Sequence, residues 1–233
     1  MPIASGKDAV IITVDGPSAS GKSTVSRAVA ERLGFTYCDS GSLYRAVTWK
    51  ALREDVDPGD EQAVTSMLSA TEWDFACADN SMVFKIDGID PGREIRSESV
   101  AENVSTIASM EPVRSFIVDK LRQMAGCGDL VMEGRDIGSV VFPEAAFKYY
   151  LDASAEERAR RRHAEYAVLN ECDDIEQVYE SLKRRDRTDS TRKTAPLQVP
   201  RDAKVIDSTA LEQDEVVELI VRDVEDRTGR DEG

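Results

Sequence analysis

The sequence predicts an α/β protein with a doubly wound parallel sheet, because short apolar strands alternate with amphipathic helices. Residues 9–14 (AVIITV) are a β-branched apolar run, which is typical of a buried parallel strand. A helical pattern begins at Ser23 and ends at Gly34, and a second short strand, FTYC, follows at 35–38. Another helix begins near Gly41, so strands and helices alternate from the start. The length of 233 residues fits one such domain with insertions.

The middle of the chain interrupts this alternation. Residues 73–95 contain alternating apolar positions and turn signals at 79–80 and 87–88, which predict antiparallel hairpins. We expect this small β-sheet to form a separate lobe inserted into the α/β chain. Helical patterns follow at 98–109 and 111–125.

The strands of the main sheet resume after these helices. Residues 130–132 and 147–151 are the next candidate strands, and residues 203–206 are the last. A final helix at 212–226 closes the predicted fold.

Composition and charge exclude several classes of protein. A hydrophobic content of 41% with 32% charged residues is typical of a globular chain. The 30 Lys and Arg against 45 Asp and Glu give a net charge of −15, which argues against nucleic-acid and anionic membrane partners, since both need a basic face. No apolar stretch approaches the roughly 18 residues of a membrane span, and no basic flank precedes an apolar run at the N-terminus. We therefore expect neither a transmembrane segment nor a secretory signal.

The four cysteines, Cys38, Cys77, Cys127 and Cys172, lie far apart and form no CxxC pair. This spacing predicts reduced thiols in the cytoplasm, with neither a zinc site nor a disulfide. The single histidine, His163, lies in a charged helical stretch, which argues against a His-based triad or metal centre.

Positive charge is concentrated in residues 158–193. This segment of 36 residues holds ten of the 30 Lys and Arg: Arg158, Arg160, Arg161, Arg162, Lys183, Arg184, Arg185, Arg187, Arg192 and Lys193. A pair of solvated helices with interspersed Asp and Glu is one interpretation. The excess of Arg over Lys favours the other, which is bidentate recognition of phosphate.

Residues 16–23 (GPSASGKS) match the phosphate-binding pattern G-x-x-x-x-G-K-[ST] at every fixed position. They follow a predicted buried strand and open a helix, which is the context that separates this motif from an ordinary glycine-rich turn. The backbone N–H groups and the helix N-terminus would face a di- or triphosphate. Lys22 would reach the β and γ phosphates, and the Ser23 hydroxyl would ligate Mg²⁺.

Such loops occur in switches, motors and kinases. The guanine-reading N-K-x-D pattern of GTPases is absent from the sequence, and so is the LSGGQ string of ABC-type ATPases. A small kinase whose acceptor is itself an anion is the remaining interpretation that we favour.

Two further segments follow predicted strands. Residues 39–45 (DSGSLYR) place hydroxyls, a phenol and a guanidinium at a helix start, and residues 134–138 (GRDIG) place Arg135 and Asp136 at the same edge of the sheet. Taken alone, the first segment fits a capped helix with a surface Arg equally well. The second segment, taken alone, fits a surface ion pair.

Together these segments resemble the bacterial cytidylate kinase family, the (d)CMP kinase branch of the nucleoside monophosphate kinases. The matching strings span nearly the whole chain in order: DGPSASGKST (15–24), DSGSLYRA (39–46), IRSESVAENVSTIASMEPVR (95–114), EGRDIGSVVFP (133–143), LDASAEERARRR (151–162), RRDRTDSTRKTAPL (184–197) and VIDST (205–209). The predicted hairpin insert fits the extra β-lobe of this branch. Ser40 and Ser139 stand where Thr is common in the family, and both keep the hydroxyl.

The resemblance implies a P-loop NTPase fold with an inserted lobe that binds the nucleoside monophosphate (NMP) and a short lid. The core would comprise residues 1–39, 116–157 and 193–233. The NMP-binding lobe would be 40–115, with its β insert at 73–95, and the lid with flanking helices would be 158–192.

The resemblance also implies site residues for both substrates. On the acceptor side these are Ser40, Tyr44, Arg45, Ser105, Arg114, Arg135, Asp136, Arg185, Asp189 and Arg192. On the donor side, the ATP phosphates would lie on Gly16, Pro17, Ser18, Ala19, Ser20, Gly21, Lys22, Ser23 and Thr24, and adenine would pack against Asp207, Ser208 and Thr209. The implied catalytic groups are Lys22, Arg158, Arg161 and Arg162.

Within the acceptor set, the resemblance implies more specific roles. Phosphate would lie on Arg45 and Arg135, with Arg185 near it. Cytosine would be surrounded by Ser105, Arg114 and Asp136. The ribose would lie near Asp189, and Arg192 would close over the phosphates.

The expected activity is ATP-dependent phosphorylation of CMP and dCMP to CDP and dCDP with Mg²⁺, by a cytoplasmic monomer without nucleic-acid or membrane partners. One alternative is a kinase of the same fold for another acceptor, such as UMP, AMP or shikimate. The hairpin insert and the set Ser105, Arg114 and Asp136 argue against it. The other alternative is a non-enzymatic nucleotide switch, for which an acceptor-independent, partner-stimulated ATPase would be diagnostic.

Overall fold

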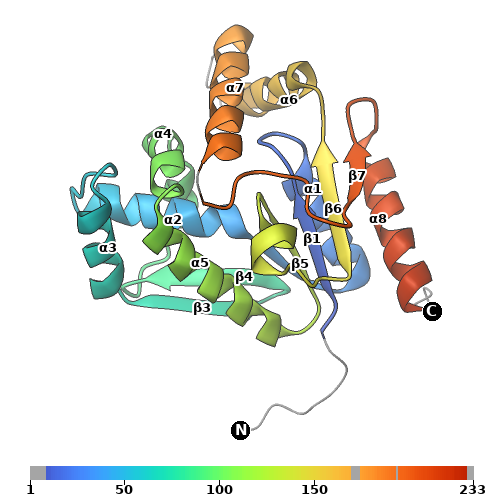
Figure 1. Ribbon diagram of the computed structural model, residues 1–233, viewed down its shortest axis with the longest axis horizontal. Coiled ribbons are helices and arrows are strands. Elements are labelled where there is room, and N and C mark those ends of the chain that lie inside the picture. Colours follow the sequence, from blue (N-terminus) through green and yellow to red (C-terminus); the bar gives the residue numbers. More distant parts are fainter. Residues whose placement is uncertain (1–8, 169–173, 193, 230–233) are drawn as a thin grey trace, which may run out of the picture.

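A mostly parallel sheet of seven strands organises the protein in the computed structural model, which describes residues 9–168, 174–192 and 194–229 (Figure 1). The strands are β1 (Ile11–Asp15), β2 (Thr36–Asp39), β3 (Trp73–Ala78), β4 (Ser81–Ile86), β5 (Leu130–Gly134), β6 (Phe147–Asp152) and β7 (Lys204–Asp207). Their order across the sheet is β3-β4-β2-β5-β1-β6-β7. All neighbouring strands pair in parallel except β3 and β4, so the predicted doubly wound α/β class is confirmed.

Helices cover both faces of this sheet. The longer ones are α1 (Lys22–Leu33), α2 (Ser40–Arg53), α3 (Glu61–Ala70), α4 (Glu98–Ile107), α5 (Glu111–Gln123), α6 (Ala155–Val168), α7 (Ile175–Thr191) and α8 (Gln213–Thr228). Three short helical segments are η1 (Gly92–Arg96), η2 (Met124–Cys127) and η3 (Ile137–Val141). Within the described part of the chain, no helix is both long and apolar enough to span a membrane.

Each face of the sheet has its own hydrophobic core. Along β5, Leu130 and Met132 point into the core beneath α2 and α5, whereas Val131 points into the core beneath α1 and α8. All three side chains are at most 1% exposed. A strand buried on both sides is a largely apolar run instead of an alternating one, which is why the segments at 9–14 and 130–132 can be recognised as strands in the sequence.

The hairpin of β3 and β4 is not a separate sheet, so this part of the prediction is wrong. The main-chain N–H of Tyr37 in β2 donates to the carbonyl of Asn80 at 2.9 Å, and Tyr37 pairs in parallel with Ser81. The hairpin therefore extends the central sheet and covers the edge that β2 would otherwise expose. Trp73 and Phe75 on its inner face pack against the core beneath α5.

Two of the cysteines form a disulfide, so the prediction of reduced thiols is wrong for this pair. Cys77 in β3 and Cys127 in η2 are joined, with 6.3 Å between their Cα atoms. They are 50 positions apart in the sequence, but α5 runs back beside the hairpin and brings η2 to it. Cys38 is buried and free, and Cys172 lies outside the described residues.

Helix α3 has no counterpart among the predicted elements. Its signal is present in the sequence, because Asp60 is a residue type that caps helices. In the structure the Asp60 carboxylate accepts the N–H of Ala63 at 3.0 Å and so caps the helix. Val64, Met67 and Leu68 then follow at helical spacing and are buried.

Candidate active site

The phosphate-binding loop lies between β1 and α1, at the edge of the sheet where the parallel strands end. Gly16 begins the loop against β6, and a Cβ atom there would lie 2.1 Å from the carbonyl oxygen of Leu151, so only glycine fits. Ser18 and Ser20 are buried within the loop. Helix α1 then starts at Lys22, with the loop beneath its N-terminus as predicted.

Lys22 is folded over this loop and is 6% exposed. Its Nζ donates to the carbonyl oxygen of Pro17 at 2.9 Å. Burial and the positive charge of Arg135 lower the pKa of Lys22 from 10.5 to about 7, although the carboxylates of Glu133 and Asp39 oppose this shift. A phosphate anion next to the ammonium would favour its charged form, so the site is electrostatically ready for an anion.

Arginines from four different elements act electrostatically on Lys22 or on one another, and Arg135 and Arg162 act on both Lys22 and Arg185. Burial together with Arg135, Arg162 and Arg45 lowers the pKa of Arg185 to about 10, which shows that these cations are close enough to repel one another. They come from the loop after β5, from α6, from α2 and from α7. We call Lys22, Arg45, Arg135, Arg162 and Arg185 the cation cluster.

The cation cluster is only partly neutralised by acidic groups. Arg45 pairs with Asp39 at 2.6 Å, and Arg135 donates to Asp189 at 3.0 Å. The Nε atoms of Arg45 and Arg185 are buried and have no hydrogen-bond acceptor among the described residues. An anion with several oxygens, such as a phosphate, would supply the missing acceptors.

A second group of residues predicted to surround the acceptor's base lies beside the cluster. Arg114 of α5 donates from Nη2 to Oδ2 of Asp136, and both side chains are at most 5% exposed. Nη2 of Arg192 lies 3.8 Å from Oδ1 of Asp136 and has no hydrogen-bond acceptor within the described part of the chain. The guanidinium of Arg114 also lies 5.6 Å from the ring centre of Tyr44. Burial raises the pKa of Asp136, and Arg114 and Arg192 oppose the rise.

Arg135 and Asp136 do not form the surface ion pair that was one interpretation of the segment GRDIG. Asp136 is buried and pairs with Arg114 and Arg192, whereas the neighbouring Arg135 pairs with Asp189 of α7. Ser40, another predicted acceptor residue, is buried and donates to the carbonyl oxygen of Glu133 at 2.7 Å. Ser105 is half-buried on α4, which contacts α7.

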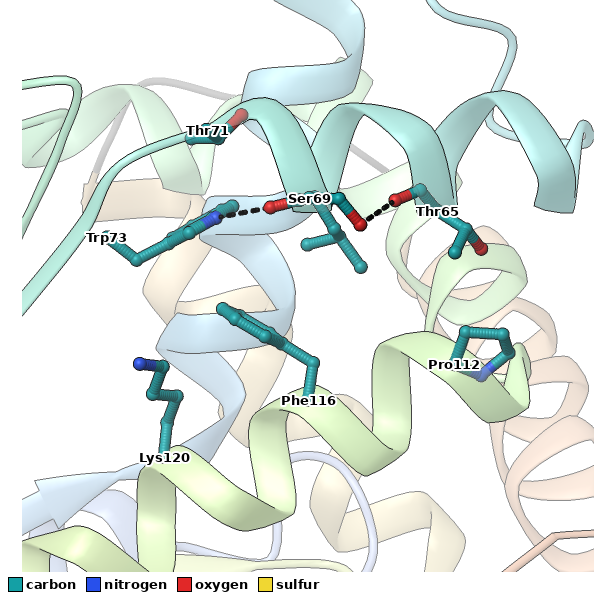
Figure 2. Close-up of a pocket in the computed structure, with 8 residues that line it drawn as sticks. Thr65, Ser69, Thr71, Trp73, Pro112, Phe116 and Lys120 are labelled. Atoms are coloured by element: carbon teal, nitrogen blue, oxygen red, sulfur yellow. Dashed lines mark hydrogen bonds between the residues drawn. The ribbon is translucent and has the colours of Figure 1, made fainter.

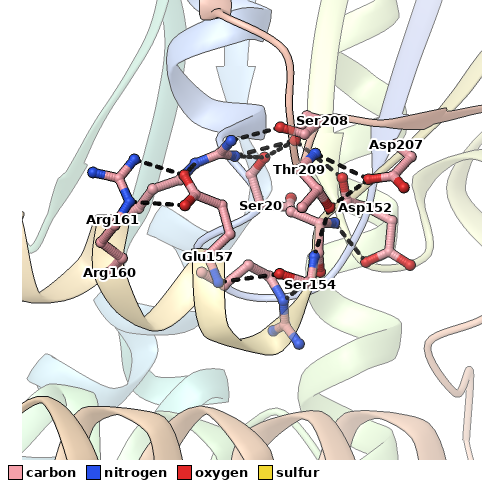
Figure 3. A network of polar contacts seen from close by, with 11 residues as sticks. Ser20, Asp152, Ser154, Glu157, Arg160, Arg161, Asp207, Ser208 and Thr209 are labelled. Carbon is pink, nitrogen blue, oxygen red and sulfur yellow. Dashed lines mark hydrogen bonds and ion pairs between the residues drawn. The ribbon is translucent and has the colours of Figure 1, made fainter.

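The three arginines predicted near the transferred phosphoryl group lie on the phosphate-binding loop. Arg158 donates to the carbonyl oxygen of Ser18 at 3.2 Å and pairs with Asp186 at 2.6 Å. Arg161 donates to the carbonyl oxygens of Ser20 and Ser208 at 3.2 and 2.7 Å (Figure 3). Through these hydrogen bonds, the two side chains connect α6 to the phosphate-binding loop.

The contact of Arg162 with Ser18 is longer than the contacts of Arg158 and Arg161 with the loop. Its Nη2 lies 3.4 Å from Oγ of Ser18, and its Nη1 pairs with the exposed Glu165 at 2.9 Å. The charge of Arg162 also acts on Lys22 and on Arg185, so Arg162 belongs to the cation cluster.

Arg161 also lines a pocket of about 450 Å³. It is lined by Glu157, Arg160, Arg161, Thr209, Ala210, Leu211, Glu212, Gln213 and Asp214. Thr209 is fixed at its rim, because the Asp207 carboxylate accepts its N–H at 2.9 Å and the N–H of Ser154 donates to its hydroxyl at 2.9 Å (Figure 3). The loop predicted at 207–209 therefore borders a pocket, and residues 210–214, which sequence reasoning missed, form much of its wall.

A second pocket, of about 380 Å³, lies between α3 and α5 (Figure 2). Trp73, Phe116 and Lys120 line it, and the indole N–H of Trp73 donates to the carbonyl of Leu68 at 3.2 Å. It shares no lining residue with the predicted site.

The comparisons with known proteins agree with the resemblance seen in the sequence. A family model described as cytidylate kinase matches residues 12–226. The cytidylate kinase of Geobacillus kaustophilus (strain HTA426) is 44% identical over 223 residues, which cover 96% of this chain and 100% of that protein. The cytidylate kinase of Caldanaerobacter subterraneus subsp. tengcongensis is 42% identical over 219 residues, which cover 94% and 96%.

Among solved structures, the fold is similar to that of an uncharacterized protein from Eubacterium ventriosum ATCC 27560. The TM-score is 0.53 at 10% identity, and the match covers 93% of this chain and 98% of that one. This likeness shows a shared fold.

Proposed function

Because the chain belongs to the cytidylate kinase family, we propose that it transfers the γ-phosphoryl group of ATP to the phosphate of CMP or dCMP. The products are ADP and CDP or dCDP. The observation that carries this proposal is the cation cluster, in which five positive side chains from five points of the sequence meet beside a phosphate-binding loop. In a chain with a net charge of −15, such a concentration indicates a site for anionic substrates.

The cluster supports a reaction between two phosphates. The phosphate of the acceptor is already a nucleophile, so the reaction needs no strong general base. It does need two mutually repelling anions to be held in line, and Lys22, Arg135 and Arg185 would reduce that repulsion. Closure of α6 and α7 over the loop would exclude water and so suppress hydrolysis of ATP.

The group around Asp136 supports cytosine as the base. Oδ2 of Asp136 accepts from Arg114, whereas Oδ1 accepts no hydrogen bond from the described residues. Arg192 lies 3.8 Å from this Oδ1 without a hydrogen bond to it, so the oxygen could accept the exocyclic amine of cytosine, which uracil lacks. With uracil, a carbonyl oxygen would face this carboxylate and leave a buried acceptor unpaired.

The residues present also fit Mg²⁺ bound together with ATP. Within the described ranges, no three His, Cys, Asp or Glu side chains cluster as metal ligands, so the protein alone offers no complete cage. Mg²⁺ prefers substrate phosphates, water and one or two protein oxygens. The exposed Ser23 hydroxyl in the first turn of α1 would be such a ligand, and the ion would neutralise charge on the phosphates.

We further propose that residues 40–115 form an acceptor lobe and that residues 158–192 form a lid with its flanking helices. The predicted acceptor residues Ser40, Tyr44 and Arg114 lie in the first range, and Arg158, Arg161 and Arg162 reach the loop from the second. The monomeric state and the cytoplasmic location stay predictions from the sequence.

A coupled assay of ADP release across CMP, dCMP, UMP, AMP and no acceptor tests the proposed function. We expect turnover with CMP and dCMP that exceeds turnover with UMP and AMP. Equal rates with every monophosphate would contradict cytosine recognition. ATP hydrolysis that no acceptor stimulates would favour the switch.

A further inference from the structure

We propose that Asp15, the last residue of β1, is a positioning residue that holds the loop carrying Arg135 and Asp136 in register with the phosphate-binding loop. The inference rests on the proposed function, since it concerns how the acceptor site is assembled. It adds a residue that lies between the two substrate sites and belongs to neither.

Both carboxylate oxygens of Asp15 are used to hold the second loop. Oδ1 accepts the main-chain N–H of Ile137 at 2.8 Å, and Oδ2 accepts the N–H of Gly138 at 2.7 Å. Asp15 is 0% exposed, so water does not compete for these bonds. Ile137 and Gly138 begin the short helix η3, where the first N–H groups have no acceptor within the helix. Asp15 supplies the acceptors.

The sheet explains why Asp15 can reach this loop. Strands β1 and β5 pair in parallel, with Asp15 opposite Gly134, so both strands end at the same level. After Arg135 and Asp136 the chain turns back over the end of β1. Gly138 makes the close approach possible, because a Cβ atom there would lie 2.8 Å from Oγ1 of Thr13 and 3.2 Å from Oδ2 of Asp15.

The two loops depend on Asp15 to different degrees. The phosphate-binding loop follows Asp15 directly, but Arg158 and Arg161 also hold it through the carbonyl oxygens of Ser18 and Ser20. For the second loop, the N–H groups that follow Asp136 both bond to Asp15. A displaced Asp136 would change its geometry towards Arg114 and the base. Loss of the carboxylate should therefore weaken acceptor binding more than ATP binding.

The test replaces Asp15 by Asn in the full chain. Asn keeps the size of the side chain but offers one acceptor oxygen, so one of the two N–H groups would face an amide donor. Asp129→Asn is a matched control. Oδ1 of Asp129 accepts the N–H of Val10 at 2.7 Å, and this bond joins the same two strands, β1 and β5, at their opposite ends. The readouts are KM for CMP and for ATP, kcat, Tm, and amide hydrogen exchange of residues 135–138 without nucleotide.

For Asp15→Asn we expect KM for CMP to rise about tenfold, as loss of a hydrogen bond to a charged group predicts, with KM for ATP changing less than about threefold. Exchange in 135–138 should become faster. Asp129→Asn should show neither effect. Equal changes in both KM values, or unchanged exchange in 135–138, would overturn the proposal.

The exchange measurement also separates this inference from the proposed function. If the wild type does not phosphorylate CMP, the function fails, but slow exchange at Ile137 and Gly138 would still support the contact with Asp15. If Asp15→Asn does not fold, amide hydrogen exchange of Ile137 and Gly138 in the wild type tests the proposal. Fast exchange of these two amides in the wild type would overturn the proposal.

Discussion

Burial of single charged groups has consequences that can be measured one residue at a time. Lys22 is the clearest case, because its ammonium lies among other cations and its pKa is lowered to about 7. Such a group destabilises the folded protein at a pH below its ordinary pKa, since the unfolded chain binds the proton more tightly. We therefore attribute its position to the proposed binding of phosphate and not to stability.

Lys22→Met should separate these two effects. Turnover should fall by about 10³-fold or more, by analogy with loss of an arginine that stabilises the transferred phosphoryl group. The free energy of unfolding without nucleotide should rise at pH 7, because a buried charge is removed. Initial rates and urea unfolding of the same preparation check both. More than about a tenth of the wild-type kcat, or a loss of stability, would contradict this role.

The pKa of Asp15 is raised, so its effect on the pH dependence of the free energy of unfolding has the opposite sign to that of a carboxylate with a lowered pKa. Burial raises its pKa from 3.8 to about 6, although the N–H groups of Gly138 and Ile137 oppose the rise; the charge of Asp136 adds to it and that of Lys22 opposes it. The folded state then binds this proton more tightly than the unfolded state does. The free energy of unfolding therefore gains a contribution as pH falls from about 6 towards 3.8.

Urea unfolding of wild type and Asp15→Asn at several pH values isolates this contribution. Relative to the variant, the wild type should gain about 2 kcal/mol as pH falls over this range, out of about 3 kcal/mol for the whole titration. The other carboxylates are common to both proteins and cancel in the difference. A difference that does not change with pH would contradict the raised pKa.

At the scale of helices and strands, the sequence was informative where a pattern lies within one element. β1 and β5 are largely apolar before their last residues, and the predicted ranges at 9–14 and 130–132 overlap the observed strands. The joining of the hairpin to β2 and the bond between Cys77 and Cys127 depend on how distant segments pack, which a local pattern does not contain. Helix α3 was missed although its cap and its spacing were present.

The disulfide should stabilise the hairpin against α5. Cys127 is exposed, so Cys127→Ser removes the cross-link without leaving a cavity. The bond closes a loop across a separation of 50 residues, and the free energy of unfolding should fall by about 2–4 kcal/mol in the variant. Dithiothreitol should lower the stability of the wild type to that of Cys127→Ser and leave the variant unchanged. If the two proteins are equally stable without reductant, the sulfurs are not bonded in solution.

At the scale of the whole molecule, the site is a meeting of segments that are far apart in the chain. The phosphate-binding loop could be predicted, because all its functional groups are contiguous and its spacing is fixed by the phosphates. Charge alone predicted the basic segment at 158–193 as a region, and only the family resemblance assigned roles to its individual residues. Arg160 and Arg184 are exposed, whereas Arg158 is buried on the loop, and only the packing of α6 and α7 decides this. The role of Asp15 could not be predicted, since its partners are 122 and 123 residues away.

The central claim is that buried Asp136 reads the base of a phosphate acceptor. The most direct test is the ratio of kcat/KM for CMP to that for UMP in wild type and in Asp136→Asn, with Asp189→Asn as the control. The wild type should favour CMP by roughly 2–4 kcal/mol, because a site built to accept a hydrogen bond rejects an analogue without the donor. Asp136→Asn offers an amide N–H to the uracil carbonyl. The kcat/KM for CMP should therefore fall, and the ratio of kcat/KM for CMP to that for UMP should become smaller. Asp189→Asn weakens the pairing with Arg135 and leaves the Asp136 side chain itself unchanged, so kcat/KM should fall for both substrates together. A CMP to UMP ratio that Asp136→Asn leaves unchanged would contradict the account.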